Sequence, residues 1–129
     1  MAGGIEIRAA HFPGRAPIDA YGNGGFRFAD MSHRGSILCL PSGIHGWNVT
    51  AFDSLREDDV ARLFDEAADF DILLLGTGKD LVPMPVEMRR RFREAGVAVE
   101  TMATGAAVRT YNVLLAEDRT VAAALIAVD

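Results

Sequence analysis

The sequence predicts an α/β fold: a three-layer single domain with a mixed, largely parallel central sheet, helices on both faces and an N-terminal β-hairpin. Segments of helical and strand character alternate from about residue 55 onward, which is typical of right-handed crossovers between parallel strands. Before that point the pattern predicts a hairpin and a meander of short strands. The length of 129 residues fits one domain, in which we expect residues 1–16 to form a loop or an extended arm.

Composition and charge exclude several classes of protein. Half of the residues are apolar and 24% are charged, which is typical of a globular domain. The net charge of −5 gives no footprint for nucleic acid, and no apolar stretch reaches the ~18 residues of a membrane span. Cys39 has no partner for an internal disulfide, and the N-terminal residues resemble neither a signal peptide nor a presequence. We therefore expect a cytoplasmic protein.

The first half contains a strong hairpin signal. Two alternating segments, Ile18–Gly22 and Gly25–Phe28, flank Asn23-Gly24, and these two residue types adopt the positive φ angles that a type I′ turn requires. Phe26 and Phe28 are predicted to share one face of the second strand. A short apolar strand over 36–40 follows, and Trp47 is expected on a further strand that ends near residue 50.

Three helices are predicted in the second half. Ser54 and Glu57 have the spacing of a capping box, and the apolar spacing after them predicts an amphipathic helix over roughly 55–68. A second helix is expected from about Pro85 to Ala95 and a third from Thr104, as its cap, to about residue 117. The predicted buried positions are Val60, Leu63, Phe64 and Ala67 in the first helix, Met88, Phe92 and Ala95 in the second, and Ala107, Val108, Tyr111 and Leu115 in the third.

Asp71–Leu75 is predicted to be the centre of the sheet, because an unbroken apolar run suits a strand that is buried on both faces. The turn that follows it is Gly76-Thr77-Gly78-Lys79, at the strand end where α/β proteins usually bind ligands. Leu81 breaks the dinucleotide fingerprint, and Leu73 and Asp80 break the P-loop pattern. Two interpretations stay open: the glycines satisfy backbone geometry, or their N–H groups and Lys79 bind an anion.

Other polar residues join this turn as candidates. The small residues Gly105, Ala106 and Ala107 allow either the sheet or a ligand to approach the third helix, and Asn112 carries a polar group that a backbone or a bound molecule must satisfy. The candidate ligand-binding residues are Gly76, Thr77, Gly78, Lys79, Thr104, Asn112 and Trp47.

The second helix carries a concentrated basic patch, Arg89-Arg90-Arg91 with Arg93. It is either a solvated face or a docking surface for an acidic partner protein, for which Arg89, Arg90 and Arg93 are the candidate residues. No catalytic residue is assigned: Ser42 lacks the glycines of a nucleophile elbow. No cofactor is expected either, and His11, His33 and His45 have no metal-binding spacing.

Several segments together resemble a known family. They are Tyr21–Phe28, Gly43–Trp47, Leu75–Lys79, and Met102-Ala103-Thr104 followed by Ala107, Thr110, Tyr111, Asn112, Leu114 and Glu117. Their order and spacing resemble the domain of unknown function that includes the mitochondrial NADH dehydrogenase (complex I) assembly factor 3. The resemblance implies a three-layer fold with a mixed five-stranded sheet and no established catalytic residues. Its mitochondrial members act as binding proteins in respiratory complex assembly.

The sequence lacks the mitochondrial presequence, so the resemblance indicates a bacterial, cytoplasmic member of the family. We accordingly expect a non-enzymatic protein that acts through protein–protein interaction, without nucleic acid as a partner. The alternative is a protein or enzyme that binds a small anionic metabolite at the Gly76–Lys79 turn. A family resemblance does not by itself decide between these functions.

Overall fold

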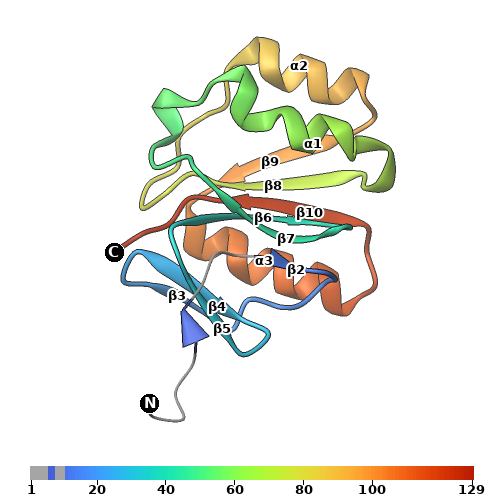
Figure 1. Cartoon of the computed structure of the whole chain (residues 1–129). Coiled ribbons are helices and arrows are strands. Elements are labelled where there is room, and N and C mark those ends of the chain that lie inside the picture. The colour runs from blue at the N-terminus through green and yellow to red at the C-terminus, as the bar shows by residue number, and fades with distance from the viewer. Residues whose placement is uncertain (1–5, 8–10) are drawn as a thin grey trace.

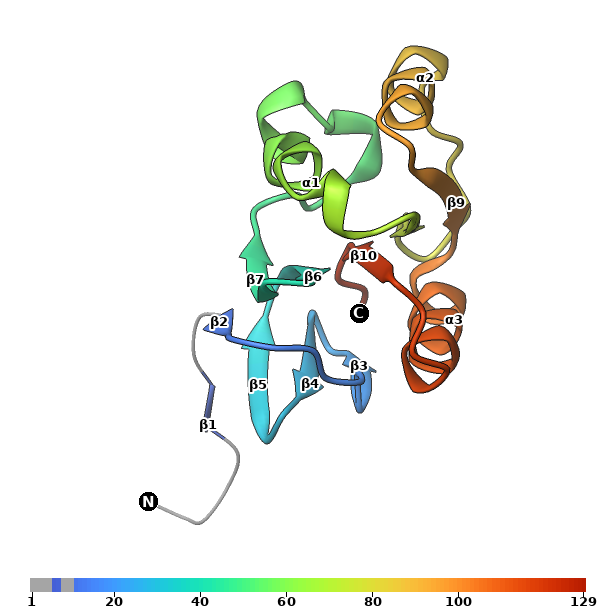
Figure 2. The same ribbon diagram turned by 90° about the vertical axis from the view of Figure 1, so that its right-hand side faces the viewer.

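The computed structural model describes residues 6–7 and 11–129, and its elements form three layers (Figures 1 and 2). A sheet in the order β2-β7-β6-β10-β8-β9 forms the middle layer. Its strands are β2 (His11–Phe12), β6 (Ser36–Leu40), β7 (Gly43–Trp47), β8 (Ile72–Gly76), β9 (Ala98–Met102) and β10 (Val121–Leu125). Helices α1 (Ala61–Asp65) and α2 (Val86–Glu94) cover one face, and α3 (Thr104–Ala116) covers the other. The predicted three-layer α/β fold is confirmed.

A smaller sheet lies beside α3 and has the order β1-β5-β4-β3. Its strands are β1 (Glu6–Ile7), β3 (Ala20–Gly22), β4 (Gly25–Phe28) and β5 (Met31–Arg34). The predicted hairpin is confirmed, because Tyr21 pairs with Phe26 and the turn residues Asn23 and Gly24 have φ angles of 52° and 79°. Phe26 and Phe28 are both buried, on the face that packs against the larger sheet.

The larger sheet is mixed, as predicted, but in the described part of the chain it is not largely parallel, because the parallel pairing is confined to its C-terminal strands. β10 runs parallel to β8, and β8 runs parallel to β9, whereas β6, β7 and β2 join by antiparallel pairing. The sheet has six strands instead of the expected five. Of the predicted arm over residues 1–16, residues 1–5 and 8–10 lie outside the described residues, and β1 and β2 pair with β5 and β7.

The predicted centre of the sheet is wrong. β8 lies second from one edge, and β10 lies between β6 and β8 in the middle of the order. Both strands are apolar runs buried on both faces, and alternate residues of β8 enter opposite cores. Leu73 and Leu75 pack in the core under α1 and α2, and Leu74 packs in the core under α3. Burial on two faces therefore identified an inner strand but not its position.

The predicted helix over roughly 55–68 is a broken helical segment. It consists of the 3-10 turn η2 (Glu57–Val60), α1, and the 3-10 turn η3 (Ala67–Asp69), and a further turn, η1 (Phe52–Ser54), precedes it. Ser54 is not the cap. The Arg56 N–H donates to Asp59 Oδ2 at 2.8 Å, so the chain enters the helical segment at Arg56. The predicted apolar positions Val60, Leu63 and Ala67 are buried, and Phe64 is partly buried.

The other two helices differ from their predictions at single residues. α2 follows Pro85 and ends at Glu94, and Gly96 beyond it has a φ angle of 85°. Ala95 was expected to be buried but is exposed, because it lies beyond the end of the helix. Thr104 is the first helical residue of α3, not its cap. None of the helices in the described part of the chain is long and apolar enough to cross a membrane.

Candidate functional site

The turn after β8 is shaped by its contact with the start of α3. A Cβ atom at Gly76 would lie 3.0 Å from both Cα and Oγ1 of Thr104, so the helix approaches the strand too closely for a larger residue. Gly78 has a φ angle of 107°, a conformation that L side chains rarely adopt. Both glycines therefore serve the backbone geometry of the turn, in agreement with the first of the two interpretations.

Hydrogen bonds occupy the turn that was expected to bind an anion. The Gly78 N–H donates to Thr104 Oγ1 at 3.0 Å, and the Thr104 N–H donates to the Gly78 carbonyl at 2.8 Å. The Thr104 hydroxyl in turn donates to the Ile126 carbonyl at 2.7 Å. Within the loop, Thr77 Oγ1 donates to the Asp80 carbonyl at 2.6 Å and accepts from the Val82 N–H at 3.0 Å. The Gly78 N–H is therefore not available to a phosphate.

Lys79 is exposed, and it lies between two hollows. The first, which we call the acidic groove, has a volume of about 560 Å³. Its apolar lining residues, which we call its floor, include Phe52, Val82 and Ile126. Three acidic residues also line it, Asp53, Asp80 and Asp129, and none of their side chains has an ion pair or hydrogen bond in the described part of the chain. Lys79 is the one cationic lining residue among the residues that the structure describes, so the acidic groove disfavours an anionic ligand.

The second hollow lies at the first turn of α3 and has a volume of about 290 Å³; we call it the α3 hollow. It is lined by Lys79 and Arg109, by Gly105 and Ala106 of the helix, and by Tyr21 of the hairpin. A Cβ atom at position 105 would overlap the Tyr21 hydroxyl, so a larger residue there would displace the Tyr21 side chain from the hollow. Two cationic side chains and the positive end of the helix dipole make this side of the turn the one that tolerates an anion.

Trp47 and Asn112 do not lie at the turn. The Trp47 indole N–H donates to the Asp59 carbonyl at 2.7 Å, and its ring is packed in the core beneath α1. Asn112 follows Thr104 by two helical turns, or ~12 Å along α3. Its side chain accepts from the Ile18 N–H and donates to the Ile18 carbonyl, both at 2.9 Å. Both polar side chains thus stabilise the fold, and Asn112 connects the segment that precedes β3 to α3.

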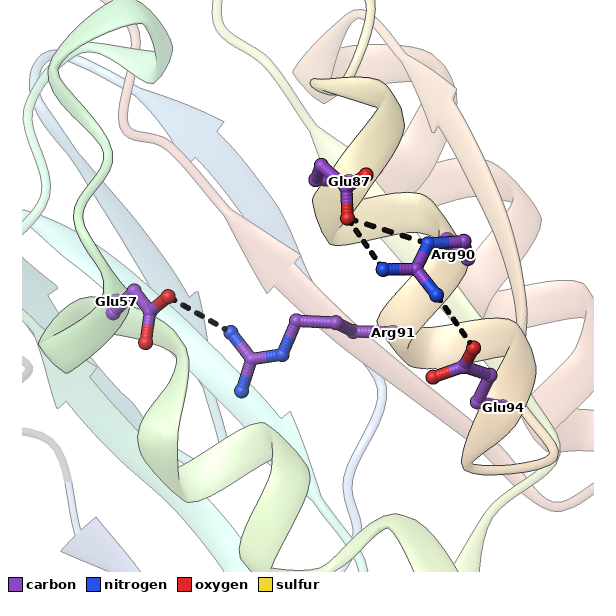
Figure 3. Close-up of polar contacts among 5 residues, drawn as sticks. All are labelled: Glu57, Glu87, Arg90, Arg91 and Glu94. Atoms are coloured by element: carbon purple, nitrogen blue, oxygen red, sulfur yellow. Dashed lines mark hydrogen bonds and ion pairs between the residues drawn. The ribbon is translucent and has the colours of Figure 1, made fainter.

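The basic patch on α2 is largely compensated by neighbouring groups (Figure 3). Arg90 contacts Glu87 at 2.6 Å and Glu94 at 2.8 Å, and Arg91 contacts Glu57 at 3.3 Å. Arg91 also lies 4.4 Å from the centre of the Phe64 ring.

The two remaining arginines of the patch differ from each other. Arg89 donates to the backbone carbonyl of Val99 on the edge strand β9 at 2.9 Å, so part of its guanidinium group is already hydrogen-bonded within the protein. Arg93 is exposed and makes no ion pair in the described part of the chain. The patch therefore presents less free positive charge than its sequence suggests.

A polar cluster that the sequence did not predict lies at the β6–β7 turn. Ser42 Oγ lies 3.0 Å from His45 Nε2 and donates to Glu66 Oε2 at 2.6 Å. In a catalytic triad the histidine stands between serine and carboxylate, whereas here the serine stands between the other two. Burial lowers the pKa of His45 below its usual value. Among the described residues, no group of three or more histidine, cysteine or acidic side chains is arranged to hold a metal ion.

An exposed apolar segment, for which the sequence pattern predicted no role, follows the candidate turn. Leu81 and Val86 expose 61% and 79% of their surface, and Pro83 and Pro85 between them are also exposed. We call this stretch the Leu81–Val86 segment. Two prolines in an apolar run are the signal that could have identified it, because proline cannot take part in the middle of a sheet.

A family model described as "Protein of unknown function (DUF498/DUF598)" matches residues 18–126. The chain belongs to this family. The chain is similar to a protein from Rhodobacter capsulatus that is named as an uncharacterized protein; the two are 41% identical over 119 residues, which cover 92% of this chain and 90% of that protein. The predicted family resemblance is therefore confirmed.

The chain is also similar to a mouse protein, NADH dehydrogenase [ubiquinone] 1 alpha subcomplex assembly factor 3. The two are 29% identical over 122 residues, which cover 95% of this chain and 66% of the mouse protein. Among solved structures, one described as an outer membrane protein from Bartonella henselae has a TM-score of 0.88 and 59% identity, and the match covers 92% of this chain and 100% of that one.

Proposed function

We propose that this chain is a non-enzymatic protein that acts through protein–protein interaction in the assembly of a respiratory NADH dehydrogenase in the bacterial cytoplasm. The similarity to the mouse assembly factor, over 95% of this chain, supports the assembly role. The observation that carries the interaction role is the Leu81–Val86 segment. Isolated apolar residues are common on protein surfaces, but an exposed apolar stretch marks a contact site.

The local structure of this segment suits a docking surface. Thr77 fixes its start, because the Val82 N–H donates to Thr77 Oγ1 at 3.0 Å. Its end enters α2 directly after Pro85. The two prolines lack N–H groups, so the segment cannot form the full set of backbone hydrogen bonds with a strand of another molecule. It therefore presents apolar side chains with a lower risk of aggregation. A segment held at both ends also loses little conformational freedom when a partner binds.

Complementation tests this proposal. The gene of the Rhodobacter capsulatus relative is deleted, and this chain is expressed in its place. We expect the deletion to lower the NADH dehydrogenase activity of isolated membranes and the amount of assembled enzyme on native gels, and this chain to restore both. A deletion without effect on the enzyme, or a chain that accumulates in the cytoplasm but restores nothing, would contradict the assembly role.

A double variant tests the surface. Leu81→Ser with Val86→Ser should fail to restore the enzyme, whereas Val113→Ser should restore it as the parent does. Val113 is a matched control because it is 56% exposed and lies on α3, away from the segment. Circular dichroism and the thermal midpoint verify that all variants fold. Full restoration by the double variant would remove the Leu81–Val86 segment as the docking surface.

The uncompensated part of the α2 patch is a further docking candidate. Arg93 is its exposed arginine without an ion pair among the described residues, while Arg89 and Arg90 already have partners. Arg93→Glu in the same complementation assay measures its contribution. A loss of restoration would indicate that this face of α2 binds an acidic partner, and unchanged restoration would show that it is not a docking surface.

The second candidate function is the binding of a small anionic metabolite at the Gly76–Lys79 turn. The α3 hollow supports it, because Lys79 and Arg109 line a hollow at the start of a helix. Thermal shift measurements with inorganic phosphate, nucleoside phosphates and dicarboxylates test it. Binding should raise the melting temperature of the parent, and Lys79→Ala with Arg109→Ala should abolish the rise. No shift with any of these compounds would reject the candidate function.

A further inference from the structure

We propose that the acidic groove binds a partner protein through a segment in which an aliphatic side chain stands next to a lysine or arginine. This inference rests on the proposed interaction function and specifies the chemistry of the partner. It uses a surface distinct from the α2 patch, which would instead suit an acidic partner. The groove combines an apolar floor with unpaired negative charge, and each of these features selects one part of the bound segment.

The floor selects the aliphatic side chain. Phe52 and Ile126 belong to the core under α1 and α2, yet both also line the groove, so its base is a continuation of that core. The volume of about 560 Å³ lies within the usual range for binding pockets and provides room for side chains of a bound segment. Burial of one aliphatic side chain contributes roughly 1.5–3 kcal/mol.

The floor is also continuous with the surface proposed above. Val82 lines the groove and belongs to the Leu81–Val86 segment, so a partner chain that crosses the segment reaches the groove without a gap. Leu81 exposes 61% of its surface at this junction. One extended partner segment could therefore contact both, and this continuity argues for a protein partner over a small molecule.

The lining carboxylates select the basic side chain. The Asp53, Asp80 and Asp129 side chains come from three separate parts of the chain, and none is paired within the described residues. They are not arranged as a metal site in the part of the chain that the structure describes. A lysine or arginine of a partner protein can pair with these carboxylates. The long aliphatic part of its side chain can lie along the apolar floor.

The wider charge distribution favours the same partner. Residues 52–71, which include the rim residue Asp53 and the helical segment after it, contain eight acidic and two basic side chains. The net charge of the whole chain is −5, so this one stretch contains a large share of the acidic side chains that make the protein negative. Such a field steers a basic surface toward the groove and increases the association rate, more strongly at low ionic strength.

The test begins with a random peptide library displayed on phage and selected against the full chain. The parent and a groove variant, Asp53→Lys with Asp80→Lys, are compared with a control, Asp65→Lys with Asp69→Lys. The control makes the same change in charge on exposed residues of α1 and η3. We expect the parent and the control to enrich peptides with an aliphatic residue beside a lysine or arginine, and the groove variant to lose this enrichment.

Binding of an enriched peptide is then measured by fluorescence polarisation, and its contacts are mapped by backbone amide NMR shifts. The dissociation constant should rise at least about tenfold for the groove variant and far less for the control, which weakens the surrounding field but leaves the groove intact, and shifts should concentrate at Phe52, Val82 and Ile126. If the groove variant does not fold, Asp53→Asn with Asp80→Asn replaces it. Peptides without the basic residue, no enrichment, or equal binding to all variants would overturn the inference.

Complementation separates this inference from the proposed function. If the groove variant restores the respiratory enzyme as well as the parent does, the inference fails and the assembly role stands. If the parent itself restores nothing but binds the peptides with the expected pattern, the assembly role fails and the groove stands as a binding site. If the groove variant alone loses restoration, with the control active, both are supported.

Discussion

Thr104→Val removes one hydroxyl that links three parts of the chain. Thr104 is fully buried, its Oγ1 donates to the Ile126 carbonyl at 2.7 Å, and the same oxygen accepts the Gly78 N–H at 3.0 Å. Valine has nearly the same shape as threonine but no hydroxyl, so the substitution removes the hydrogen-bonding atom with little change in side-chain volume. The variant therefore isolates the contribution of the hydroxyl to the turn after β8.

The expected loss follows from the two hydrogen bonds. Each contributes about 1 kcal/mol net, and a buried partner that is left unpaired costs a further 1–3 kcal/mol or so. Gly78 lies in a partly exposed loop where water can replace the lost acceptor, whereas Ile126 is buried. We therefore expect a loss of about 2–4 kcal/mol. With a urea m-value of about 2 kcal/mol/M, the unfolding midpoint should fall by about 1–2 M.

Thr104→Ser is the matched control because serine keeps the hydroxyl and loses one methyl group, at a cost of about 1 kcal/mol. Urea unfolding followed by circular dichroism compares the three proteins, and amide hydrogen exchange at Gly78 gives a local measurement. The Gly78 amide should exchange faster in the valine variant than in the serine variant. If the valine variant is as stable as the serine variant and protects Gly78 equally, the hydroxyl does not hold the turn.

Three other substitutions or conditions test separate features. Asn112→Asp places a carboxylate oxygen against the Ile18 carbonyl, so we expect about 2 kcal/mol of destabilisation at pH 7, partly recovered when the carboxylate is protonated near pH 3.5. Burial raises the pKa of Cys39 from 9.0 to about 12, so folding stability should fall as pH rises from about 9 toward 12 because the unfolded thiol ionises first. Gly43→Ala creates a Cβ atom that overlaps the Phe12 carbonyl at a φ angle of 144°, and should destabilise the protein by about 2 kcal/mol or more in urea unfolding.

Each of these expectations has its own control. Asn112→Ala loses the same hydrogen bonds without adding a charge, so its stability should not recover at low pH. Cys39→Ala should flatten the alkaline decline, and an unchanged slope would remove the thiol as its source. Gly22→Ala shares the positive φ of Gly43 but meets no atom within 4 Å, and equal losses at the two positions would show that the contact with β2 is not the cause.

Local patterns predicted the elements of this fold better than their arrangement. The hairpin and the three-layer architecture follow from alternation and turn residues that lie within a few positions of one another. The order of the strands did not, because β8 and β10 are both apolar runs buried on two faces, and the sequence alone does not distinguish their positions. The break between η2 and α1 likewise leaves the apolar spacing of an uninterrupted helix unchanged.

The candidate site was predicted only in part, because its contacts join distant residues. Gly78 and Thr104 were both named, but their mutual hydrogen bonds leave no local signal in the sequence. Asn112 was chosen as a polar residue on an apolar helix face, and its partner is the backbone of Ile18 on another element. The acidic groove was missed altogether, since no pattern connects aspartates that are separated by tens of residues.

The place of β10 has a consequence for the order of events during synthesis. β10 comes after every other described strand in the sequence, yet its neighbours β6 and β8 pair only with it on their inner sides. Both halves of the sheet, β2-β7-β6 and β8-β9, are therefore synthesised before the strand that joins them. Until then each half presents an unpaired edge and an apolar surface, which are features that chaperones bind and that promote aggregation. The larger sheet can be completed only after residue 125 has been translated.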